Sequence, residues 1–291
     1  MEHIILSGFS DEIAPELDLQ LAAIREWGLS HIELRAADGV NVSDFSTEKV
    51  KEVKNKLAGA GVSVSSIGSP IGKIGMEEDF APHLEKLKRT LEIQKELGAP
   101  YLRMFSFYIP QGRAPEDFRE EVLDRVGRMA EEAKAWDSML LHENEKGIYG
   151  DSAPRCKELL EAFYGPHFKA VFDFANFVQV GQQTLPAYEL LKPYVEYVHV
   201  KDAQWGTGAV VPAGQGDGHV KEILTDLIGG GLEGLLVPGA PPDGLRGPGR
   251  PGAGPPEAGL RLRRQVRLEA GPGFPARNPG GHPPGKGGAV I

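Results

Sequence analysis

The chain has 291 residues, a formal net charge of −9, 41% hydrophobic residues and one cysteine. This length suits one α/β domain of ordinary size, and a single cysteine excludes an internal disulfide or a cluster of thiolate ligands. No stretch approaches the roughly 20 apolar residues of a membrane-spanning helix, and the apolar run after Met1 is too short for a signal peptide. We therefore expect a cytoplasmic protein.

The charge is unevenly distributed along the chain. Residues 1–234 carry 24 basic and 38 acidic side chains, a net charge of −14, whereas residues 235–291 carry eight basic and three acidic ones. A strongly acidic body disfavours binding to a phosphate backbone. We expect neither a nucleic acid nor a membrane among the partners.

Short apolar runs alternate with segments of helical periodicity. The expected strands are Ile4–Ser7, His31–Leu34, Val62–Ile67, Tyr101–Phe105, Met139–His142, Ala170–Phe172, Tyr194–Val200 and Leu235–Val237. The expected helices are Glu16–Trp27, Thr47–Ala58, Phe80–Leu97, Pro115–Trp136, Ala153–Phe163, Thr184–Lys192 and His219–Ile228. Eight strands and seven helices predict an α/β fold, a (β/α)₈ barrel with an incomplete last unit. A doubly wound sheet is the alternative, less favoured because no glycine-rich phosphate loop follows the first strand.

Polar side chains follow several of the expected strands. In a barrel, the carboxyl ends of the strands form the site, so residues there are candidates for chemistry. Glu143, Asp173 and His199 fall on three consecutive strands, and two carboxylates with an imidazole suit a hard or borderline divalent cation. Other candidates at strand ends are Glu33, Arg35, Arg103 and Lys201. Taken singly, each could instead be a helix cap, a satisfied core residue or a solvated loop residue.

Five motifs, in this order along the chain, resemble one known family. They are HIELR from His31, LLHENEKGIYGD from Leu140, FDFANF from Phe172, YVHVKDA from Tyr197 and VPAGQGDG from Val211. The chain is similar to the xylose isomerase-like barrels, specifically the sugar phosphate isomerase/epimerase group, which also includes inosose dehydratases, ketose 3-epimerases and type IV apurinic endonucleases. The resemblance covers most of the first 234 residues and implies the (β/α)₈ TIM-barrel fold.

The resemblance also implies roles for particular residues. Glu143 corresponds to a metal ligand that is also a catalytic acid/base, and Asp173 and His199 correspond to the second and third ligands. The implied cofactor is a divalent metal ion, with Mn²⁺, Co²⁺ or Mg²⁺ preferred over Zn²⁺. Asn176 falls where some epimerases have a substrate-contacting histidine. With this resemblance, the expected substrate-binding residues are Glu33, Arg103, Asn176 and Lys201.

The family's fourth ligand, a second catalytic glutamate on the eighth strand, is absent. The aligned residue is Gly239, and residues 235–291 contain 14 Gly and 12 Pro, which disfavour helices and central strands. We expect a barrel over residues 1–237 and a disordered or frameshifted tail over 238–291. Residues 234–242 can be encoded by codons that, after loss of one nucleotide, read Gly-Phe-Trp-Ser-Leu-Glu-Pro-His. This alternative frame contains the missing glutamate. It favours a frameshift over the alternative, an evolved tail that binds a partner.

The expected activity is a metal-dependent isomerisation or epimerisation of a sugar or sugar phosphate, by proton transfer next to a carbonyl through an enediolate, impaired here by loss of the fourth ligand. An inosose dehydratase-like lyase is the close alternative, and a catalytically dead sugar-binding barrel is the non-enzymatic one. An apurinic endonuclease is disfavoured, because its three-metal cluster needs more histidines than the eight present. A homo-oligomer is compatible with the sequence.

Overall fold

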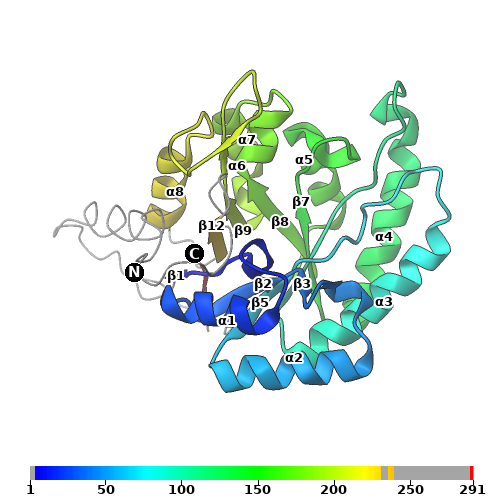
Figure 1. Cartoon of the computed structure of the whole chain (residues 1–291). Coiled ribbons are helices and arrows are strands. Elements are labelled where there is room, and N and C mark those ends of the chain that lie inside the picture. Colours follow the sequence, from blue (N-terminus) through cyan, green and yellow to red (C-terminus); the bar gives the residue numbers. More distant parts are fainter. Residues whose placement is uncertain (1–3, 231–234, 239–288, 291) are drawn as a thin grey trace, which may run out of the picture.

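The computed structural model describes residues 4–230, 235–238 and 289–290, and the side chains of residues 4–230. Nine strands form one parallel sheet at the centre, and helices surround it (Figure 1). The order is β1-β13-β12-β9-β8-β7-β6-β5-β2. A hydrogen bond from Glu33 N to Gly8 O (3.0 Å) links the segment after β1 to β2, so the two ends of this order meet. The predicted barrel fold is confirmed.

The strands match the expected runs closely. They are β1 (Ile4–Ile5), β2 (His31–Leu34), β5 (Ser63–Ile67), β6 (Tyr101–Met104), β7 (Met139–Glu143), β8 (Phe168–Asp173), β9 (Val195–Val200), β12 (Leu235–Pro238) and β13 (Ala289–Val290). Two short hairpins lie outside this sheet, β3 (Ala36–Ala37) with β4 (Val40–Asn41) and β10 (Asp202–Ala203) with β11 (Val210–Val211).

The helices are α1 (Leu17–Glu26), α2 (Thr47–Ala60), α3 (Phe80–Leu97), α4 (Arg119–Ala135), α5 (Ala153–Phe163), α6 (Phe174–Gln179), α7 (Thr184–Leu191) and α8 (Val220–Gly229). Local chemistry fixes several ends. Ser46 and Asp79 accept hydrogen bonds from backbone N–H groups at the starts of α2 and α3, and both helices end at a glycine with positive φ, Gly61 and Gly98. None of the described helices is both long and apolar enough to span a bilayer.

Two details of the helices differ from the expectation. The residues Pro115–Phe118 form a 3₁₀ turn before α4 rather than its first turn. The short helix α6 follows β8 directly, and its N-terminus is capped by Asp173, whose Oδ1 accepts a hydrogen bond from Asn176 N (2.9 Å). Asp173 therefore has a structural role as well as its place in the candidate site.

The predicted tail, with Gly239, falls largely outside the described residues. Two of its residues, Ala289–Val290, form β13, which pairs with both β1 and β12. The expected eighth strand is present as β12 and pairs with β9 over four residues. It is therefore paired on both sides.

The segment after β5 is tied to the segment after β6. Phe105 N and Phe107 N donate hydrogen bonds to Ile71 O (2.8 Å) and Gly72 O (2.9 Å). Gly72 has φ +87°, and a Cβ at this residue would lie 2.0 Å from the carbonyl oxygen of Phe105. No other residue fits there without moving the backbone, so this segment keeps a fixed course over the barrel end.

His83 on α3 should limit stability in acid. Its Nε2 accepts a hydrogen bond from Gly72 N (2.7 Å), and burial lowers its pKa to about 4. The unfolded chain therefore binds the proton first, and stability should fall as pH drops from about 6.5 towards 4. His83→Gln keeps an acceptor without this titration. Between pH 7 and 4.5 its Tm should fall less than that of the wild type; equal falls would contradict this role of His83.

Candidate metal centre

Three adjacent strands bring Glu143, Asp173 and His199 together. Asp173 on β8 is paired with His199 on β9, and Glu143 on β7 is paired with Val171, two residues before Asp173. Side chains two residues apart on a strand share a face, so this register directs all three into the same space. Each is buried, with 2% or less of its surface exposed.

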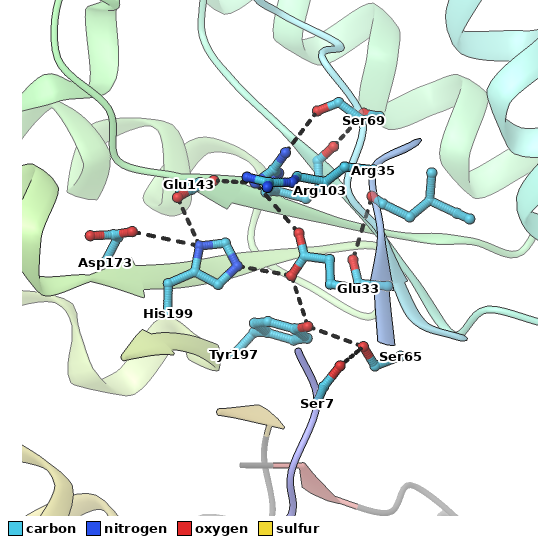
Figure 2. Close-up of polar contacts among 12 residues, drawn as sticks. Ser7, Glu33, Arg35, Ser65, Ser69, Arg103, Glu143, Asp173, Tyr197 and His199 are labelled. Carbon is cyan, nitrogen blue, oxygen red and sulfur yellow. Dashed lines mark hydrogen bonds and ion pairs between the residues drawn. The ribbon is translucent and has the colours of Figure 1, made fainter. Parts of the chain in front are cut away.

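Their donor atoms lie at short range. His199 Nδ1 is 2.8 Å from Glu143 Oε1 and 3.7 Å from Asp173 Oδ2 (Figure 2). One donor atom from each residue can be chosen so that all three lie within 4.8 Å of one another. Glu143 Oε2 and Asp173 Oδ2 are buried without a hydrogen-bond partner among the described residues. Carboxylate oxygens that accept no hydrogen bond, next to an imidazole, fit a divalent cation, so the three residues predicted as ligands could bind a metal together.

Two cations balance the charge of this cluster. Arg103 Nη1 lies 3.1 Å from Glu143 Oε2, and Lys201 Nζ lies 3.4 Å from Asp173 Oδ2. Burial alone would raise the pKa of Glu143, but His199 and Arg103 outweigh it and hold this pKa well below its ordinary value. Burial raises the pKa of Asp173, and Lys201 only partly offsets this rise.

Glu33 lies behind His199. Its Oε2 is 2.9 Å from His199 Nε2 and accepts a hydrogen bond of 2.9 Å from the Tyr197 hydroxyl, while Arg103 Nη1 lies 3.4 Å from its Oε1. The side chain is completely buried. Glu33 stays a predicted substrate contact. Its direct contact here is with the imidazole, where a carboxylate can orient a metal-binding histidine.

His199 thus lies between two carboxylates. Burial alone would lower its pKa, but Glu143 and Glu33 raise the pKa of His199 to about 9. Without a cation, the ring is therefore an imidazolium at neutral pH and donates from both nitrogens. Nδ1 faces the other two candidate ligands and Nε2 faces Glu33 (Figure 2). The ligand atom that the ring would offer to a metal is therefore Nδ1.

The other expected contacts lie around this cluster. Asn176 Nδ2 donates to Asn144 O (2.8 Å) and, at 3.4 Å, to Glu143 Oε1. Lys201 Nζ lies 4.9 Å from the ring centre of Phe9. Three of the expected substrate-binding residues thus contact a candidate ligand directly: Asn176, Arg103 and Lys201. Their roles in substrate binding stay predictions.

Two buried residues of the site, Asn144 and Tyr197, are not among the candidates predicted from the sequence. The Asn144 amide exchanges two hydrogen bonds with the Asp173 backbone, of 2.9 and 3.0 Å, and so ties the end of β8 to the segment after β7. Tyr197 holds Glu33 and lies 3.3 Å from Ser65 Oγ. Tyr197 lies two residues before His199 on the same strand, and such residues share a face. This spacing could have predicted that Tyr197 points into the site.

The family model described as xylose isomerase-like TIM barrel matches residues 21–265. A 3-dehydroshikimate dehydratase of Bacillus anthracis is 21% identical over 177 residues, which are 61% of this chain and 63% of that protein. The chain thus spans somewhat less than two thirds of this curated relative.

Solved structures show the same fold. A xylose isomerase-like TIM barrel protein from Mycobacterium smegmatis in complex with magnesium has a TM-score of 0.67 at 17% identity, over 91% of this chain and 96% of that one. A D-tagatose 3-epimerase-like protein has a TM-score of 0.72 at 15% identity, over 91% of this chain and 97% of that one. The chain belongs to the xylose isomerase-like TIM barrel family.

Proposed function

We propose that the chain has the site of a divalent-metal-dependent isomerase or epimerase acting on a sugar or sugar phosphate. The observation that carries this proposal is the buried cluster of Glu143, Asp173 and His199 at adjacent strand ends, in which two carboxylate oxygens accept no hydrogen bond from the residues that the structure describes. The likeness to an epimerase-like structure and to a magnesium complex supports it. We propose Mn²⁺, Co²⁺ or Mg²⁺ as the ion and the cytoplasm as the compartment.

The reaction that fits these residues is proton transfer at a carbon next to a carbonyl. A bound divalent ion would supply Lewis-acid stabilisation of the negative charge that develops on the oxygens of an enediolate. Glu143, with a pKa held well below its ordinary value, is a carboxylate at neutral pH and can accept the proton. Arg103 and Lys201, both next to the cluster, can hold substrate oxygens, and Asn176 can donate a hydrogen bond from its amide.

A dehydratase is the second candidate, and one observation favours it. The curated relative is named 3-dehydroshikimate dehydratase. Dehydration begins with the same proton abstraction, and the outcome then depends on whether the neighbouring hydroxyl leaves. A catalytically inactive sugar-binding barrel is the non-enzymatic alternative, motivated by Gly239 at the position of the missing glutamate.

One assay separates these candidates. The chain, and a version carrying Gly239→Glu, are incubated with Mn²⁺ and a panel of ketoses, keto-inositols and their phosphates in D₂O. We expect deuterium incorporation next to the carbonyl, with epimer or isomer formation. An unsaturated product would favour the dehydratase. Absence of exchange in both versions, although a substrate binds, would identify a binding protein and contradict the proposed function.

A further inference from the structure

We propose that a cavity beside the metal centre binds an oxyanion group, a carboxylate or phosphate, carried by the substrate. The claim that the substrate carries the oxyanion rests on the proposed function. The claim that the cavity binds an oxyanion does not. The cavity has a volume of about 250 Å³ and lies where the strands β2, β5 and β6 end. Three basic side chains line it, from Arg35, Lys73 and Arg103, with one acidic side chain, from Asp11.

Arg103 provides the buried part of this site. Its side chain is 9% exposed, and its Nε has no hydrogen-bond partner among the described residues. Its Nη1 lies 3.1 Å from Glu143 Oε2 and 3.4 Å from Glu33 Oε1, and its Nη2 donates to Ser69 O at 3.4 Å. A guanidinium in the wall of a cavity is a planar group of N–H donors, and carboxylates and phosphates are the groups that match this geometry.

Lys73 lies on the segment after β5, which is held in place by its hydrogen bonds to the segment after β6. Its Nζ is 4.2 Å from the ring centre of Phe105, another residue of the cavity lining. Its ion pair with Glu145 Oε2, at 3.0 Å, is partly exposed, with 30% and 19% of the two side chains accessible. Partly exposed ion pairs contribute little, so an incoming oxyanion can replace Glu145 on this ammonium group at small cost.

The side chain of Arg35 packs directly against the backbone of Gly68, which has no Cβ. A Cβ on Gly68 would lie 2.5 Å from Arg35 Cγ and 3.1 Å from Glu33 Oε1, so only glycine leaves this space to the two side chains. Asp11 Oδ1 and Glu12 Oε1 fix the guanidinium at 3.0 and 2.9 Å. The position of the guanidinium is therefore set before a ligand arrives, which reduces the entropy that binding must overcome.

The cavity is joined to the metal centre through Arg103. Figure 2 shows this side chain between Glu143 and Glu33, and the same side chain lines the cavity. A substrate with its hydroxy-ketone at the metal centre could place an anionic substituent among Arg103, Lys73 and Arg35. The site would then favour acidic substrates over neutral sugars.

The test is anion binding to the full, metal-free chain by calorimetry at low salt, with inorganic phosphate in one arm and acetate in the other. We expect saturable binding of one anion per chain. Lys73→Gln should weaken it about 10-fold, because one charge-assisted hydrogen bond is lost, and Lys73→Arg should retain it. Lys54→Gln is the matched control, since Lys54 pairs with Glu96 on the exposed surface, and should leave the affinity unchanged. The anion with the higher affinity, phosphate or acetate, identifies the kind of oxyanion that the cavity prefers.

Two results would overturn the proposal: no saturable binding of either anion, or equal affinity in Lys73→Gln and the wild type. Circular dichroism and Tm of each variant establish that it is folded. Because no metal or turnover is involved, the outcome is separate from that of the proposed function. Anion binding without any activity on ketoses would contradict only the proposed function, and activity confined to neutral ketoses without anion binding would contradict only this inference.

Discussion

Replacing Glu143 by Gln is expected to lower the affinity of the chain for Mn²⁺ by more than about 100-fold. The change removes one of the two carboxylates of the cluster and leaves a neutral amide of almost the same shape. Loss of a residue that only orients a ligand typically costs about 10–100-fold, so loss of a ligand itself should cost more. Calorimetry or Mn²⁺ electron paramagnetic resonance measures the difference, and Tm values establish that the variant is folded.

Two further variants make this result specific. Glu33→Gln should have the smaller effect, about 10–100-fold, since Glu33 contacts the imidazole and is expected to hold its orientation. Glu145→Gln is the matched control, because Glu145 is two residues from Glu143 yet pairs with Lys73 outside the cluster. Equal affinity in Glu143→Gln and Glu145→Gln would rule out Glu143 as a ligand.

The second large effect concerns position 239. Gly239→Glu should raise Mn²⁺ affinity and increase activity on keto-sugars by about 10²–10⁴-fold, the usual contribution of a positioned general acid or base. The reason is the register of β12, where Val237 pairs with His199 and Pro238 with Val200. Position 239 follows this strand directly, and a carboxylate there would add an anionic donor and the second acid/base group.

Restoring the alternative reading frame from Leu235 onward should have a larger effect than the single substitution, because it also replaces the glycine- and proline-rich residues. Metal affinity, Tm and activity should then rise together. Gly247→Glu, which adds the same charge elsewhere in this segment, is the control and should change none of them. Equal stability and metal affinity in the original and restored chains would show that residues 238–291 are a genuine part of the protein.

The order of strands and helices could be read from the sequence because apolar runs, caps and glycine stops agree along almost the whole chain. Ser46, Asp79, Gly61 and Gly98 are local signals, and each ends or starts a helix as such residues do. The short helix α6 was missed because its six residues give too few turns for a period to be recognised. The sequence indicated both a ligand and a helix cap for Asp173, and the cap is present.

The candidate ligands could be predicted because the carboxyl end of a strand is recognised from the local sequence. The carboxyl ends of three adjacent parallel strands lie side by side, so the polar residues there lie close together. The contact between Glu33 and His199 could not be predicted, because it joins residues 166 positions apart. Such a contact depends on β2 and β9 lying across the barrel from each other. The cavity beside Arg103 likewise depends on the segment after β5, which contains none of the residues predicted from the sequence.

The measurement that tests the central claim most directly is the anomalous scattering of Mn²⁺ in crystals of the full chain. One ion should be found, with oxygens of Glu143 and Asp173 and Nδ1 of His199 at about 2.0–2.3 Å, and with His199 Nε2 still hydrogen-bonded to Glu33. An ion bound elsewhere, or coordination through Nε2 with Glu33 displaced, would contradict this account of the site.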